Sequence, residues 1–245
     1  MYGRGGAQVR FGPSFTPDVI KWLLGLCLGL HLVLMYFAPG GWILWLLLSA
    51  EAVWERFALW QLATSSLLAG SGTALLFEGL AIWMFGSELA VRWGRERFLT
   101  YLGLCAVGGN VAMALAAGGF HLLGLDVGYG IVLPTLSLAV LALVLAYSLM
   151  FADRQVLLFF VMPVQTLYFV PALLFIQLVV GVPLILWIGT LAVLAIGTAF
   201  CWQDGETRLT LKTLEHRFRR WRMRGKLRAI DNDELRRQRD RRNLH

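Results

Sequence analysis

Residues 146–164 have the sequence AYSLMFADRQVLLFFVMPV. One apolar run ends there at Asp153 and Arg154, and a second apolar run follows and ends at Pro163. The polar turn separates two apolar segments, 130–150 and 164–181. Each approaches the roughly 20 residues that a helix needs to cross a hydrocarbon core of about 30 Å. The stretch therefore predicts the end of one membrane-spanning helix, 130–150, and its connection through residues 151–163 to the next, 164–181.

The composition of the whole chain supports the same interpretation. Of its 245 residues, 58% are hydrophobic and only 15% are charged, and the mean hydropathy is +0.66. These values lie outside the range of a soluble domain of this size. Four further apolar segments are long enough to span a bilayer. They are residues 18–38, 63–85, 98–118 and 183–203.

The six segments predict an all-α membrane protein with three parts. Residues 1–17 form an N-terminal segment, residues 18–203 a six-helix transmembrane domain, and residues 204–245 a basic tail. Because cytoplasmic loops carry an excess of Lys and Arg, the basic residues give the orientation. Basic residues flank the ends expected to be cytoplasmic, and only Arg56 falls on the opposite side. We expect both termini in the cytoplasm, and an arginine-rich composition favours a bacterial inner membrane.

A non-spanning stretch follows the first predicted helix, which ends at Pro39, Gly40 and Gly41. Residues 42–60 contain an apolar run that is too short to cross a membrane, together with four Trp residues and three charged residues. Indole rings prefer the level of the lipid headgroups, where their polar edge meets water. The pattern predicts a first loop that lies in the membrane interface.

These features are similar to the rhomboid family of intramembrane serine proteases. Members of that family have a long first loop that ends in a Trp-Arg pair, where this chain has Trp60 and Gln61. The family's second helix ends in Phe-Gly, which Phe85 and Gly86 resemble. The family also has a basic turn before its third helix, which residues 92–99 resemble. The stretch 146–164 is similar to the family's turn after the nucleophile helix. The resemblance covers about residues 18–203 and implies a rhomboid-like six-helix bundle.

The residues that carry the family's chemistry differ in this chain. The family's nucleophile is the Ser of Gly-x-Ser-Gly on the fourth span, and the matching position is Ser137, flanked by Thr135 and Leu138 instead of Gly. The base is a His on the sixth span, but no His lies between His121 and His216, and Trp187 is near the expected position. A Ser hydroxyl is not activated without a nearby base.

Polar donors on the second span assist the family's reaction, and they are also missing. The corresponding positions hold Ala69, Ala74 and Glu78. A carboxylate inside a span is rare and is usually paired, protonated or in contact with water. Glu78 therefore either contacts a client helix or holds water in the former catalytic cavity, or it bonds to a neighbouring helix as a protonated acid.

The resemblance and the substitutions together predict a pseudoprotease that binds transmembrane segments of client membrane proteins, for stabilisation, quality control or scaffolding. We expect seven residues to line the former catalytic cavity. They are Trp60, Gln61, Ala69, Ala74, Glu78, Ser137 and Trp187. Two alternatives stay open: a serine protease with a displaced base around Ser137, and a structural subunit of a membrane complex.

The tail has its own pattern. Residues from Asp204 onward include fourteen basic and seven acidic side chains, which accounts for the entire net charge of +7. Apolar residues recur there at intervals of three and four, which predicts an amphipathic helix on anionic lipid. Its anchoring residues would be Leu211, Leu214, Phe218, Trp221, Arg217, Arg220 and Arg224. Docking to another protein is the next interpretation, and nucleic acid is the least favoured partner.

The three cysteines show no metal-type spacing. Cys27, Cys105 and Cys201 fall inside or at the end of predicted spans and far apart in the sequence. We expect them to pack as small apolar residues, and we expect neither a metal nor a cofactor.

Overall fold

The computed structural model describes residue 13 and residues 15–36, 41–152, 155–158 and 162–203. The chain divides into two units, Met1–Cys201 and Trp202–His245, and only Trp202 and Gln203 of the second unit are described. The predicted tail helix, with all seven of its anchoring residues, therefore lies outside the described residues. Most of the predicted N-terminal segment also lies outside them.

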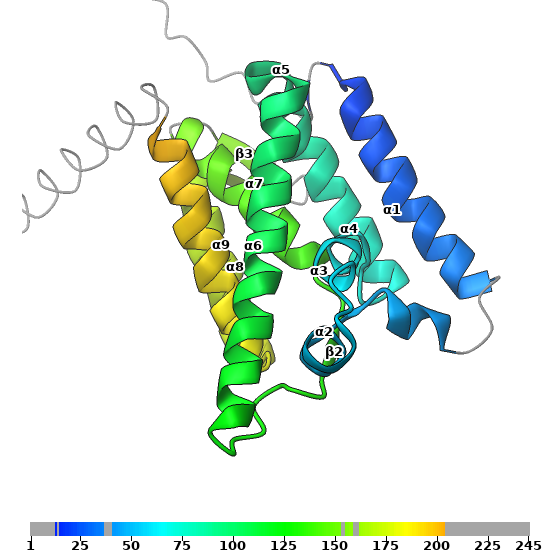
Figure 1. Ribbon diagram of the computed structural model, residues 1–245. Helices are drawn as coiled ribbons and strands as arrows, with labels where there is room; N and C mark the ends of the chain where they lie inside the picture. The colour runs from blue at the N-terminus through cyan, green and yellow to red at the C-terminus, as the bar shows by residue number, and fades with distance from the viewer. Residues whose placement is uncertain (1–12, 14, 37–40, 153–154, 159–161, 204–245) are drawn as a thin grey trace, which may run out of the picture. The chain divides into compact units, whose positions relative to one another are not determined.

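The first unit is built mainly from helices (Figure 1). The longer ones are α1 (Asp18–Tyr36), α6 (Arg95–Leu122), α7 (Leu136–Met150), α8 (Phe169–Val180) and α9 (Leu184–Trp202). A further continuous helix combines α4 (Gly72–Ala81), a π-helical turn η3 (Ile82–Gly86) and α5 (Ser87–Trp93). Among the described residues, three helices are long and apolar enough to cross a membrane: Gly72–Trp93, Arg95–Leu122 and Leu184–Trp202.

Helix α7 is the centre of this unit, since twelve of its fifteen residues are buried. It packs against α6, α8, α4 and η3. Small residues allow the closest approaches between α6 and α9, because a Cβ at Gly109 would fall 2.7 Å from Cγ2 of Val193. The three cysteines are free and buried, consistent with the expected packing role.

The second predicted span, 63–85, is wrong at its start. Residues 61–67 form two short helices, α3 (Gln61–Thr64) and η2 (Ser65–Leu67), and α4 begins only at Gly72. The helix is interrupted because two of its carbonyl groups bind a distant segment: Ser65 accepts from N–H of Thr135 over 3.0 Å, and Leu68 accepts from N–H of Leu136 over 3.3 Å. Ser71 then caps α4 by accepting from N–H of Ala74 over 3.1 Å.

The fifth predicted span, 164–181, is also too long. Residues 162–165 belong to β4 (Met162–Gln165), which pairs antiparallel with β3 (Gln155–Leu158). A short 3-10 turn follows, and α8 begins at Phe169. A proline lacks the backbone N–H that a helix interior requires, so Pro163 suits a position before the helix rather than inside it.

The first loop does not span, as predicted. It consists of a 3-10 turn η1 (Trp42–Trp45), β1 (Leu48–Ser49) and α2 (Ala50–Arg56). Strand β1 pairs antiparallel with β2 (Val132–Leu133), which precedes α7 in the sequence. Figure 1 shows α2 and α3 beside α6, and contacts between these helices join the loop to the bundle.

Candidate functional site

Ser137 lies in the first turn of α7, where the resemblance places a nucleophile, and its side chain is half-buried. The residue before the helix, Thr135, is fully buried, and its Oγ1 donates to Oγ of Ser65 over 3.0 Å. Leu136 and Leu138 on either side of Ser137 are almost completely buried. Ser137 is therefore a half-buried polar residue between two buried apolar residues in the sequence of the helix.

Leu138 occupies the space between α7, α6 and α9. A Cβ at Gly189 of α9 would lie 3.1 Å from Cδ1 of Leu138 and 2.5 Å from Sδ of Met113. A Cβ at Gly109 of α6 would lie 3.4 Å from the same Leu138 atom. The two glycines bring three helices together, and the Leu138 and Met113 side chains fill the gap among them.

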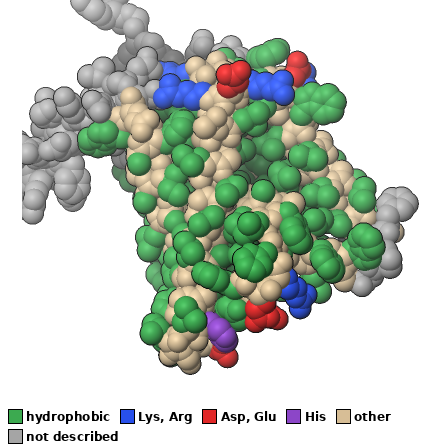
Figure 2. Space-filling model, viewed as in Figure 1, with side chains coloured by type: hydrophobic (Ala, Val, Ile, Leu, Met, Phe, Trp, Pro, Cys, Tyr) green, Lys and Arg blue, Asp and Glu red, His purple; other side chains and the backbone are tan. Residues whose placement is uncertain are grey.

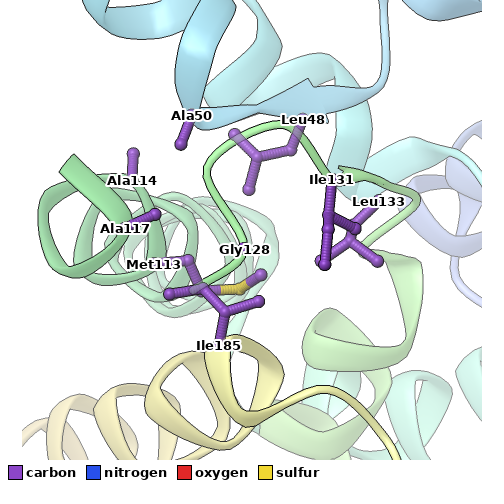
Figure 3. A pocket seen from close by; sticks show the side chains of 9 residues that line it. All are labelled: Leu48, Ala50, Met113, Ala114, Ala117, Gly128, Ile131, Leu133 and Ile185. Atoms are coloured by element: carbon purple, nitrogen blue, oxygen red, sulfur yellow. The ribbon is translucent and has the colours of Figure 1, made fainter. Parts of the chain in front are cut away.

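A small cavity lies between the first loop, α6 and the start of α9 (Figure 3). Its volume is about 10 Å³, which is room for a single water at most. The side chains of Met113, Ile131, Leu133 and Ile185 point toward it, and all nine of its lining residues are apolar or Gly. Such a cavity offers no polar side chain to bind or activate a water molecule.

Two of the predicted site residues, Trp60 and Gln61, lie together under the first loop. The indole Nε1–H of Trp60 donates to the carbonyl of Trp45 over 2.8 Å. Gln61 is buried; its Oε1 accepts from N–H of Ser49 over 3.1 Å, and its Nε2 donates to the carbonyls of Leu44 and Trp45 over 3.3 Å each. Both residues thus fix the backbone of the loop.

Glu78 is placed differently. It lies half-buried on α4, and it is close enough to Cys27 of α1 to interact with it electrostatically. The next residue, Gly79, faces Leu24 of the same helix α1. Within the described part of the chain, one carboxylate oxygen of Glu78, Oε2, is buried and has no hydrogen-bond partner. This arrangement puts Glu78 at the α1 side of α4.

The structure therefore does not bring the seven predicted residues into one cavity. Trp60 and Gln61 line a hollow of the first loop, and Glu78 faces α1. Ala69 is buried in the segment before α4, Ala74 is half-buried in the first turns of α4, and Trp187 is half-buried near the start of α9.

Sequence reasoning missed a buried polar cluster next to the start of α7. Asn110 of α6 is fully buried, and its Nδ2 donates to the carbonyl of Leu62 over 2.8 Å and to Oγ of Ser65 and Ser66 over 3.1 Å and 3.0 Å. Its Oδ1 has no partner among the described residues. An Asn inside an apolar span is a signal that could have revealed the cluster, because polar groups there need partners.

A second polar cluster lies at the other end of α6. The ring of His121 stacks on Tyr129 with centroids 3.9 Å apart, and its Nδ1 is 3.3 Å from Oδ1 of Asp126. The hydroxyl of Tyr129 donates to Oε1 of Glu55 over 3.4 Å. His121 thus contacts loop residues, and no group of three His, Cys, Asp or Glu residues suited to a metal occurs among the residues described.

Comparison with known families gives a clear match. The family model of the Rhomboid domain matches residues 56–206, which is more than half of the chain. The match extends from the end of α2 past the end of α9, so it includes Ser137, the buried polar cluster and the helices around them. A comparison with curated proteins found no match. On the strength of the domain match, this chain belongs to the rhomboid family.

Proposed function

We propose that this chain is a catalytically inactive rhomboid protein that binds the transmembrane segments of other membrane proteins. The observation that carries the proposal is the position of Leu138. It stands where the family's motif has Gly, and it fills the space between α7 and α9. Glycine at such a position lets another backbone come close, whereas a Leu side chain excludes a peptide from the region around Ser137.

The lack of a base supports the same proposal. Helix α9 contains no His, and the half-buried Trp187 stands near the position where the family has one. His121 contacts Asp126 and Tyr129 instead of Ser137. A Ser hydroxyl with no adjacent base remains protonated near neutral pH and is a poor nucleophile.

The proposed client surface is the apolar face of α4 and α8. Leu76 of α4 is 72% exposed, and Phe175 and Leu178 of α8 are 65% and 66% exposed. Inside a bilayer these side chains meet lipid or another helix. Packing between helices in lipid depends on close van der Waals contact, so an apolar side-chain surface of this kind suits a transmembrane client.

The proposed topology is six spans with both termini in the cytoplasm of a bacterium. Figure 2 shows basic side chains gathered at the end of the viewed face where α6 begins. Arg92, Arg95 and Arg97 lie in this part of the chain, which supports a cytoplasmic location for it. The basic tail would add attraction to anionic lipids on the same side, at about 1 kcal/mol for each basic residue near the surface.

Photocrosslinking tests client binding. A photoreactive amino acid at Phe175 samples the proposed client face, and the same amino acid at the 56% exposed Leu115 of α6 is a matched control. We expect a reproducible membrane-protein crosslink from position 175 that is weaker or absent from position 115. No crosslinked protein at position 175, or equal crosslinks at both positions, would contradict the proposal.

The stoichiometry of any co-purified partner tests the alternative of a structural subunit. A structural subunit would purify with the same partner in a fixed ratio from cells grown under different conditions. A client-binding protein would show partner ratios that change with the abundance of each client.

A further inference from the structure

The first loop encloses a hollow of about 760 Å³ that has no role in the proposed client binding. Its volume falls within the range of about 300–1,000 Å³ that is usual for sites of small molecules. Three tryptophans, Trp42, Trp45 and Trp60, are among the residues that line it, together with Glu51 and Arg56. Figure 2 shows acidic and basic side chains together near the position of α2 in Figure 1.

The wall of the hollow is fixed by hydrogen bonds that leave its charged groups available. Gln61 binds the backbone of Ser49, Leu44 and Trp45, and the Trp60 indole binds the carbonyl of Trp45. Thr64 adds a bond from its Oγ1 to the carbonyl of Leu46 over 2.8 Å. These bonds fix the backbone of the loop without using the carboxylate of Glu51 or the guanidinium of Arg56.

Neither Glu51 nor Arg56 forms an ion pair with any residue that the structure describes. Arg56 is exposed, and Glu51 is half-buried with Oε2 near Gly130. A guanidinium group binds a phosphate oxygen pair well, because its N–H groups match the geometry of the anion. A carboxylate beside indole faces binds an ammonium group through charge and cation–π attraction.

We propose that this hollow binds the headgroup of a zwitterionic phospholipid. Arg56 takes the phosphate, and Glu51 with the indole rings takes the ammonium group. The source of the headgroup is a membrane lipid rather than a soluble phosphodiester, because exposed apolar residues, among them Trp42 and Trp45, line the hollow. Leu44 lines it and is 53% exposed, and indole-rich surfaces of this kind prefer the bilayer interface.

Native mass spectrometry of the detergent-purified protein tests the site. The probes are a short-chain phosphatidylethanolamine and a phosphatidylglycerol with the same chains, which has the phosphate but lacks the ammonium group. We expect the wild type to prefer phosphatidylethanolamine. Glu51→Gln should weaken the binding of phosphatidylethanolamine about threefold to fivefold and leave the binding of phosphatidylglycerol unchanged. Arg56→Gln should weaken the binding of both lipids by a similar factor.

Matched controls use charged residues outside the hollow. Arg95→Gln and Glu96→Gln, at the start of α6, should leave the binding of both lipids unchanged. The Glu51 change preserves the loop contact made by the residue's backbone N–H with the carbonyl of Tyr129, which measures 3.1 Å. Thermal unfolding shows whether each variant folds, and Arg56→Lys, which retains the charge, should keep more phosphate affinity than Arg56→Gln.

Three results would overturn the assignment. Unchanged lipid affinities in both hollow variants would show that lipids bind elsewhere. Competition by glycerophosphoethanolamine at the same concentration as the lipid would assign the site to a soluble phosphodiester. A peptide retained in the wild type and released by Glu51→Gln, with no preference between the two lipids, would assign it to a protein partner.

Discussion

The indole of Trp54 packs on Gly118, so closely that a Cβ at Gly118 would fall 2.6 Å from Cε2 of the ring. The ring also donates Nε1–H to the carbonyl of Ala114 over 2.9 Å. Trp54 belongs to α2 and Gly118 to α6, so this contact docks the first loop on the bundle. The missing side chain of Gly118 is what allows the approach.

Gly118→Ala should disrupt the contact between the indole of Trp54 and helix α6. Inserting a methyl group into a packed site costs about 1–3 kcal/mol, so we expect a lower free energy of unfolding and faster proteolysis of the first loop. Thermal unfolding in detergent and limited proteolysis measure the two effects.

The neighbouring Gly119 provides the control. A Cβ there meets nothing within 4 Å, so Gly119→Ala should not destabilise the protein. Equal stability of the two variants would mean that Trp54 does not need the space above Gly118.

Ser137 should not react with a serine-directed probe. A fluorophosphonate needs an activated hydroxyl and access to it, and Ser137 has buried Leu136 and Leu138 on either side. We expect equal labelling of the wild type and Ser137→Ala, with an active serine hydrolase in the same membranes as the positive control. Labelling that disappears in Ser137→Ala would restore the interpretation as a protease with a displaced base.

Helices of the bundle can be predicted where a long apolar run determines them. They are harder to predict where hydrogen bonds to residues distant in the sequence determine where a helix begins. The runs that became α6 and α9 are long and uninterrupted, and helices formed there. The break before α4 depends on N–H groups of Thr135 and Leu136, which lie about 70 residues away in the sequence. No local pattern around Ser65 and Leu68 contains that information.

The site residues show the same difference. The resemblance places Gln61 where the family has the Arg of its Trp-Arg pair. That Gln61 fixes the first loop depends on its hydrogen bonds to backbone groups of residues 44–49. The sequence predicts that Glu78 lines the former catalytic cavity. Its location on the side of α4 that faces α1 depends on how α1 packs against α4. A sequence gives the type of each residue directly, but the residues that a side chain contacts are known only from the packed structure.

Asn110→Ala should destabilise the bundle. The change removes three hydrogen bonds and leaves the carbonyl of Leu62 without its side-chain partner. The expected loss is about 1–3 kcal/mol, seen as a lower midpoint of thermal unfolding. Thr100→Ala is the control, because the hydrogen bond of Thr100 Oγ1 within the described residues is to the carbonyl of Glu96 in its own helix. A midpoint for Asn110→Ala as high as that of the control would show that the cluster adds no stability.

Glu78→Leu should raise the midpoint of thermal unfolding. The buried Oε2 of the half-buried Glu78 has no hydrogen-bond partner in the described part of the chain. Because an unsatisfied buried polar atom costs about 1–3 kcal/mol, replacing this carboxyl with an apolar side chain should be stabilising by an amount of that order. Glu96→Leu is the comparison. Because Glu96 is exposed in the first turn of α6, its replacement should not raise the midpoint of thermal unfolding.

Since Glu78 lies toward α1, the crosslink from Phe175 should persist in Glu78→Leu. A stabilised variant that loses this crosslink would show that the carboxyl group takes part in client binding, and a destabilised variant would show that it has a structural partner in the bundle.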